Sequence, residues 1–265
     1  MLIQSYMTRL VLVASEILAE MAECQDSSFW IHADRLAGQL DQWHQALPPE
    51  LHLAALSSVD RTLTQEKALY LMHMMYIDSR LQLYCRLLEG FQNCTGGPSP
   101  QPSVHLLGSL FNQVPKHMCE TYTAFSIQLA RIASLLYSQE VIMTRCWLVV
   151  CAVFDVCIVL LLGICRKYFT DSSGSFTDLP AHVHTCLTVL RFCSSGDIAA
   201  HRLMDMLEPI LELWNCLGST SRVQQEGQMR IEYILDERSA DIFTVVRMTY
   251  QLLDLMPQTR SNVWV

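Results

Sequence analysis

The stretch that decides the fold is WLVVCAVFDVCIVLLLGIC, residues 147–165, nineteen residues with a single charge at Asp155. Arg145 precedes this stretch and the pair Arg166 and Lys167 follows it. A run of this length and polarity is typical of a transmembrane span, or of a helix that is covered on all sides by other helices of the same protein. Both interpretations predict a helix.

The position of Asp155 separates the two interpretations. It lies near the middle of the run, where an aspartate costs about 2.5–3.5 kcal/mol on membrane-insertion scales. The other expected helices of the chain are amphipathic. The sequence therefore favours a central buried apolar helix in which Asp155 is paired to an arginine. A single-span membrane-anchored helical protein that uses Trp147–Cys165 as its span stays open as the alternative.

Apolar residues recur at helical spacing through most of the remaining chain. No alternating strand pattern extends over five residues, so we expect an all-α fold, with residues 1–265 forming a single large multi-helix domain. The expected helices cover about residues 1–24, 29–47, 64–88, 115–136, 141–169, 181–193, 197–217, 222–237 and 240–256.

Glycine and proline residues predict where these helices are interrupted. Gly90 is a C-terminal stop for the helix that ends near Leu88. Residues 94–103 and 171–178 are expected to be loops, because each combines glycine with serine or proline. Pro209 lies inside an apolar stripe and predicts a kink or break, since an interior proline costs a helix roughly 3 kcal/mol.

Composition excludes several classes of protein. The chain is 51% apolar and 17% charged, which is incompatible with a disordered chain. Its net charge is −8 and it has no Lys/Arg-rich segment, so we expect no direct nucleic-acid contact. The eleven cysteines include no C-x-x-C pair and indicate a reducing compartment. Because no hydrolase, dinucleotide or phosphate-loop motif occurs, we expect no enzyme, no catalytic residues and no cofactor.

Three local patterns could form a functional site, but each is better explained by an ordinary role in packing or on the surface. His182, His184 and Cys186 are the densest histidine–cysteine group, and we interpret them as surface histidines beside a buried cysteine, with no metal site. The methionine-rich stretch 72–75 could line an adaptable pocket but is more typical of a core. Residues 236–255 mix acidic and apolar side chains as an activation segment does, yet their regular stripe favours a packed helix.

A family resemblance begins at residues 40–51, LDQWHQALPPEL, which fit the pattern L-x-x-W-x-x-x-L-P-x-x-L. This run resembles a segment of the helical regulatory region, or middle homology region, of fungal zinc-cluster transcription factors. Trp147, Phe154 and the run 160–162 resemble an interior helix of the same region. Residues 186–190 and 199–202 resemble the helix pair that closes the domain.

The resemblance covers about residues 1–217 and leaves the expected C-terminal helices, about 222–256, outside it. Two positions depart from the family pattern, because Leu87 follows Arg86 where the family has proline, and Asp155 replaces a small residue. The family's six-cysteine zinc cluster does not occur in these 265 residues. We therefore expect either a truncated gene model or a regulator without its own DNA-binding domain.

The resemblance implies transcription regulation in the nucleus by a helical effector module. The implied partners are other transcription factors or coregulators, a small-molecule effector and a second copy in a dimer, with no membrane. No cofactor-binding residue can be assigned. Four aromatic residues are expected to anchor the core: Trp43, Trp147, Phe154 and Trp214.

Overall fold

The computed structural model describes residues 2–23, 29–57, 60–94, 114–170, 179–223, 244 and 248–249. Every regular element in these residues is helical, which confirms the all-α fold. Two short 3-10 helices, η1 (Pro49–Leu51) and η2 (Leu53–Ser57), follow the second α-helix. The α-helices are α1 (Leu2–Glu23), α2 (Phe29–Gln45), α3 (Leu63–Cys94), α5 (Lys116–Ser138), α6 (Trp147–Thr170), α7 (Leu179–Ser194) and α8 (Ile198–Val223).

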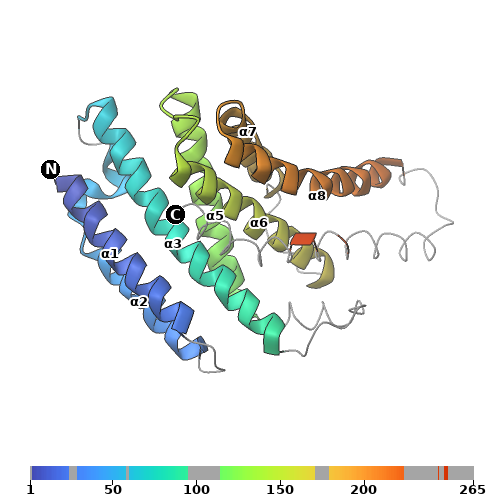
Figure 1. The fold of residues 1–265 in the computed structure, drawn as a ribbon, viewed down its shortest axis with the longest axis horizontal. Helices are drawn as coiled ribbons and strands as arrows, with labels where there is room; N and C mark the ends of the chain where they lie inside the picture. Colours follow the sequence, from blue (N-terminus) through green and yellow to red (C-terminus); the bar gives the residue numbers. More distant parts are fainter. Residues whose placement is uncertain are drawn as a thin grey trace.

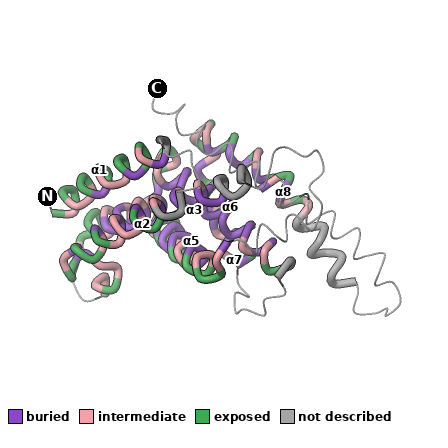
Figure 2. The backbone as a smooth tube through the Cα atoms, turned by 90° about the horizontal axis from the view of Figure 1, so that it is seen from below, coloured by how far each residue is buried: buried purple, intermediate pink, exposed green. Residues whose placement is uncertain are grey.

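The helices form one packed array with α5 and α6 in its middle. Helices α1, α2 and α3 pack against one another at one end, and α7 and α8 lie at the other (Figure 1). Helix α6 contacts α3, α5 and α7, so it has neighbours on several sides. Figure 2 shows the same arrangement as a buried centre flanked by more exposed outer helices.

Helix α6 is the central buried apolar helix that the sequence predicts. Every residue from 149 to 162 is buried, and 89% of the apolar window Trp147–Lys167 lies inside the protein. Asp155 is only 1% exposed and interacts with neighbouring groups rather than standing alone. The protein's own helices therefore cover the stretch that could otherwise span a membrane.

Helix α1 is the second described helix that is long and apolar enough to cross a membrane, by length and composition alone. Only 11% of its window Leu2–Met21 is buried in the protein. One stripe, containing Leu10 and Ile17, packs against α2 and α3. Four large apolar side chains point to the outside instead: Leu2, Val11, Leu12 and Leu18, between 44% and 57% exposed.

Local side-chain caps explain where two of the helices begin. Thr62 and Gln65 form a capping box at the start of α3, because each side chain accepts a hydrogen bond from the other's backbone N–H, at 3.3 and 3.0 Å. The Asp197 carboxylate accepts from the N–H groups of Ala199 and Ala200 at 2.7 and 3.2 Å. These contacts satisfy backbone donors that the first turn of a helix leaves unpaired.

The expected helix over 141–169 is wrong at its beginning, because α6 starts only at Trp147. The cause is the end of α5, where Glu140 has a left-handed φ of 55°. The N–H of Val141 donates to the Leu136 carbonyl at 3.1 Å and that of Glu140 to Tyr137 at 3.0 Å. These two hydrogen bonds together form a Schellman motif, which turns the chain out of helical geometry.

Three other boundaries differ from expectation. The backbone of α3 stays helical through Gly90 to Cys94, which an interior glycine permits at a cost of about 1 kcal/mol. Helix α8 continues through Pro209, so no break occurs there. It also runs to Val223, across the expected gap between 217 and 222.

Several expectations fall outside the described residues. They are the loops expected after Cys94 and from Asp171 to Asp178, most of the helices at about 222–237 and 240–256, and the side chain of Trp214. Among the other expected anchors, Trp43 and Phe154 are buried at 7% and 3% exposure. Trp147 is half-buried and packs against the edge of the core at the start of α6.

Candidate functional site

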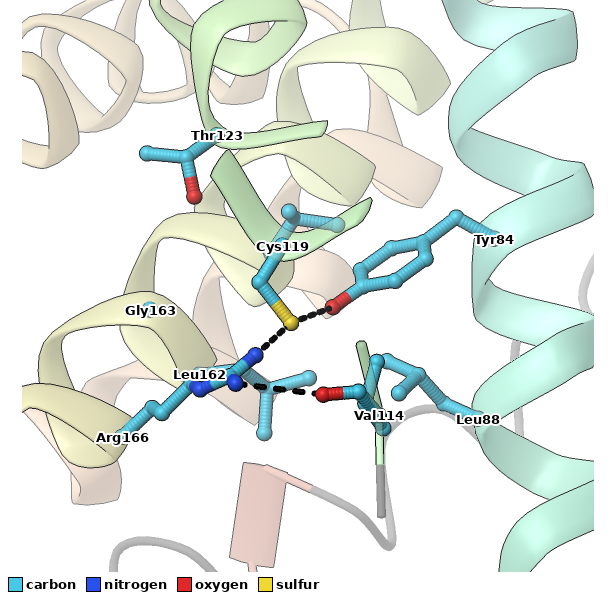
Figure 3. Close-up of a pocket in the computed structure, with 9 residues that line it drawn as sticks. Tyr84, Leu88, Val114, Cys119, Thr123, Leu162, Gly163 and Arg166 are labelled. Carbon is cyan, nitrogen blue, oxygen red and sulfur yellow. Dashed lines mark hydrogen bonds between the residues drawn. The ribbon is translucent and has the colours of Figure 1, made fainter. Parts of the chain in front are cut away.

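A small cavity lies where α3, α5 and α6 meet (Figure 3). Its volume is about 20 Å³, which is room for one or two heavy atoms, because a single water needs about 10–15 Å³. Five of the nine lining residues are apolar or glycine, and four carry side chains that can form hydrogen bonds. The lining residues are Tyr84, Leu88, Val114, Cys119, Thr123, Val159, Leu162, Gly163 and Arg166.

The polar wall is organised around the sulfur of Cys119. The guanidinium of Arg166 donates one hydrogen bond to this sulfur and another to the carbonyl of Val114, the latter at 3.1 Å. The Tyr84 hydroxyl lies 3.3 Å from the same sulfur. Figure 3 shows the three side chains converging from α5, α6 and α3. A thiol beside a guanidinium is in the kind of environment that favours the thiolate.

Helical spacing explains how each element supplies its part of the cavity. Cys119 and Thr123 are four residues apart on α5 and therefore share one face. Gly163 and Arg166, three residues apart, do the same near the end of α6. Because Gly163 has no side chain, it leaves the space that the cavity occupies. Arg166 reaches this space from the last turns of the most apolar helix.

Replacing Gly163 by alanine should stabilise the protein by about 0.5–1 kcal/mol, because glycine is a poor helix former. An added Cβ would lie 3.5 Å from the Thr123 hydroxyl and 3.8 Å from Leu179, both ordinary contact distances. Urea unfolding would measure the gain. A loss of stability would show instead that the cavity cannot accept one methyl group.

A second polar cluster joins the end of α2 to α3. The ring of His44 stacks on Tyr76 at 4.6 Å between centroids and meets the edges of His52 and His73 at 5.2 and 5.6 Å. The Nε2 atom of His73 lies 2.8 Å from the Leu51 carbonyl, to which it can donate in the neutral ring. Burial lowers the pKa of His73 to about 4, and it lowers the pKa of His44 as well.

Neutral imidazoles are the ligands that metals use, but this cluster is not built as a metal site. In the part of the chain that the structure describes, no group of three His, Cys, Asp or Glu side chains is arranged to hold an ion. The Nε2 atoms of His52 and His73 both face backbone carbonyls, at 3.2 and 2.8 Å. The cluster therefore fixes the irregular chain between α2 and α3.

Arg80, at 7% exposure, anchors the neighbouring side of α3. Its guanidinium lies 3.0 Å from the Asp41 carboxylate and donates to the Ala37 carbonyl at 2.7 Å. The same group lies over the rings of Tyr122 and Phe125, 5.8 and 5.3 Å from their centroids. These contacts connect α2, α3 and α5 and compensate the buried charge, although Nε of Arg80 has no hydrogen-bond partner among the described residues.

The residues that the sequence singles out do not gather into a site. On α7, His184 is exposed and Cys186 is buried, as the sequence predicts, whereas His182 is half-buried and interacts with another group. Cys186 forms a hydrogen bond with Cys157 of α6, and this contact, together with burial, raises the pKa of Cys157. In the stretch 72–75, two of the three methionines are completely buried and the third packs against the core.

The sequence analysis missed both polar clusters. Neither Cys119 nor Tyr84 carries a recognisable motif, and Arg166 stands out only as a basic flank of the apolar run. The histidines of the second cluster lie on α2 (His44), between the two 3-10 helices (His52) and on α3 (His73). Such groups come together only when helices pack, so spacing along one helix gives no signal for them.

Comparison of the chain with protein-family models, with curated protein sequences and with solved structures gives no match.

Proposed function

We propose that this chain is the helical regulatory module of a fungal zinc-cluster type transcription factor. The module acts in the nucleus through other transcription factors or coregulators, without contacting nucleic acid itself. The net charge of −8 supports this division of labour, because phosphate binding needs clustered cations that the sequence lacks. The proposal rests on the resemblance of the chain to that family and on how the resembling segments pack.

The observation that carries the proposal is the packing of the run 40–51. The four apolar residues that define its pattern, Leu40, Trp43, Leu47 and Leu51, are all between 0% and 7% exposed. Trp43 also donates from Nε1 to the backbone carbonyl of Tyr6 at 3.2 Å. The run that resembles the family is thus a structural junction of α1 with α2. This role supports a regulatory scaffold of the kind that the resemblance implies.

Binding of a protein partner is better supported as the signal that this module receives than binding of a small-molecule effector. The cavity of about 20 Å³ is far below the roughly 300–1,000 Å³ of drug-sized ligand sites. The outer face of α1, in contrast, exposes Val11, Leu12 and Leu18, each more than 40% accessible. Exposed apolar side chains on one helix are suited to contacts with a coregulator or with a second copy in a dimer.

A reporter assay tests the proposal. The complete chain is fused to a heterologous DNA-binding domain, and transcription from its binding site is measured in a fungal host. We expect a severalfold change in either direction relative to the DNA-binding domain alone. A reporter level equal to that of the bare DNA-binding domain, with the fusion equally abundant and folded, would contradict the proposal.

A matched pair of variants locates the surface in the same assay. Replacing both Leu12 and Leu18 by glutamate should abolish the reporter effect if α1 recruits the partner. Glutamate at Met143 and Ile198, which are 62% and 73% exposed on other parts of the surface, should leave it intact. All four positions are exposed, so neither pair disturbs the core.

A further inference from the structure

The partners of Cys119 set it apart from Cys146. Among the cysteines whose side chains the structure describes, six are buried, whereas Cys119 and Cys146 are half-buried. The sulfur of Cys119 accepts a hydrogen bond from the guanidinium of Arg166, and it also faces the Tyr84 hydroxyl at 3.3 Å. A cation beside sulfur stabilises the thiolate, which is the nucleophilic form of cysteine.

Thr123 supplies a second and independent feature of the same cavity. It is only 6% exposed, and its hydroxyl has no hydrogen-bond partner among the described residues. The hydroxyl lines the cavity and lies 3.5 Å from the position that a Cβ of Gly163 would occupy. The oxygen of this hydroxyl is not fully buried, because the fully buried side-chain N and O atoms without a partner in the described residues are Arg80 Nε and Gln139 Oε1. A molecule that enters the cavity can therefore reach it.

The size of the cavity restricts which molecule that can be. A volume of about 20 Å³ accommodates one or two heavy atoms, since a water needs about 10–15 Å³. Hydrogen peroxide, the smallest hydroperoxide, has only two heavy atoms and fits this volume. The half-buried sulfur of Cys119 forms part of the wall, so an entering peroxide meets it directly.

We propose that Cys119 is an oxidation site at which hydrogen peroxide, bound between Arg166 and Thr123, converts the thiolate to a sulfenic acid. The sulfur attacks one peroxide oxygen, so that an S–O bond forms while the O–O bond breaks. Sulfur loses two electrons and the peroxide gains them. The departing hydroxide takes a proton from solvent and leaves as water, with the Thr123 hydroxyl donating to it during the transfer. This chemistry does not depend on the proposed function in transcription.

Peroxide labelling of the complete, unmodified chain tests the assignment. The protein is treated at pH 7 with limiting hydrogen peroxide and dimedone, which traps sulfenic acids, and the label on each cysteine is quantified by mass spectrometry. Cys146 is the internal control, because it is equally half-buried but has no arginine contact among the described residues. A cation that stabilises the thiolate raises the fraction of the nucleophilic form at pH 7. We expect Cys119 to be labelled severalfold faster than Cys146, and equal or slower labelling would overturn the proposal.

Two substitutions separate the roles of the partners. Thr123→Val should slow peroxide labelling of Cys119 severalfold but leave its alkylation by iodoacetamide unchanged, because alkylation needs no donor to a departing oxygen. Arg166→Gln should slow both reactions, and Arg166→Lys should restore much of the rate by keeping the charge. Unchanged peroxide rates in Thr123→Val and Arg166→Gln would overturn the proposal. If a variant fails to fold, the comparison of Cys119 with Cys146 in the unmodified protein decides.

Discussion

Replacing Leu160 by alanine should lower the free energy of unfolding by about 3–4 kcal/mol. Leu160 is 0% exposed in the middle of α6, and α6 contacts α3, α5 and α7. The truncated side chain therefore leaves a cavity that several rigid helices cannot close. Since whole domains are stable by only about 5–15 kcal/mol, this single change removes a large part of the total. Equilibrium unfolding in urea measures it.

Leu135→Ala on α5 is the matched control, because it removes the same atoms from a side chain that is 43% exposed. We expect it to cost less than about 1 kcal/mol, as most surface substitutions do. A similar loss of stability at both positions would mean that α6 is not at the centre of the core. Unchanged urea m-values would show that the comparison concerns stability alone.

Acidification from pH 7 to pH 4 should destabilise the protein by roughly 3 kcal/mol through His73 alone. Burial is the main cause that lowers the pKa of this imidazole, from 6.5 to about 4, while the hydrogen bond to Leu51 opposes the shift. The unfolded chain therefore binds a proton near pH 6.5 that the folded protein does not bind until about pH 4. Stability is fully present above pH 6.5 and decreases as the pH falls toward 4. His44, whose pKa is also lowered, adds to the same trend.

His73→Gln isolates this contribution, because it removes the titrating ring and keeps an N–H donor near the Leu51 carbonyl. Free energies of unfolding are measured for both proteins between pH 4 and pH 7. The free energy of unfolding of the unsubstituted protein minus that of the variant should decrease by roughly 3 kcal/mol on acidification. Only the unsubstituted protein loses the contribution of His73. Parallel curves would contradict the assignment of a buried neutral His73. Contributions from groups that do not contact position 73 are common to both proteins and cancel.

The helices themselves were largely predictable, because apolar periodicity and run length determine where a helix must be buried. Residues 147–165 offer almost no polar face, so composition predicts a helix that is kept from water, and Asp155 near its middle favours cover by other helices over lipid. The start of α6 was not predictable, since the residue that turns the chain is Glu140 rather than glycine. Gly90 and Pro209 predict interruptions of a helix, yet α3 and α8 continue through them. Packing can outweigh a local preference of about 1–3 kcal/mol.

The polar clusters could not be predicted from one sequence. The contact of Arg166 with Cys119 joins positions 47 residues apart on different helices. The contact of His73 with Leu51 joins a helix to a 3-10 turn. Whether such residues meet depends on the rotation and offset of packed helices, which apolar periodicity leaves undetermined. Of the residues in these two contacts, Arg166 is the one that the sequence marks. It is a cation at the end of the most apolar helix and therefore needs a partner.

The central claim is that the protein's own helices, and not lipid, cover the apolar run of α6. Hydrogen exchange of the detergent-free protein, resolved by peptide mass spectrometry, tests it most directly. We predict that the amides of residues 149–162 exchange more slowly than those of any other described helix, and only through global unfolding. A chain that stays in solution only with detergent or lipid, or whose α6 amides exchange rapidly in plain buffer, would contradict the claim.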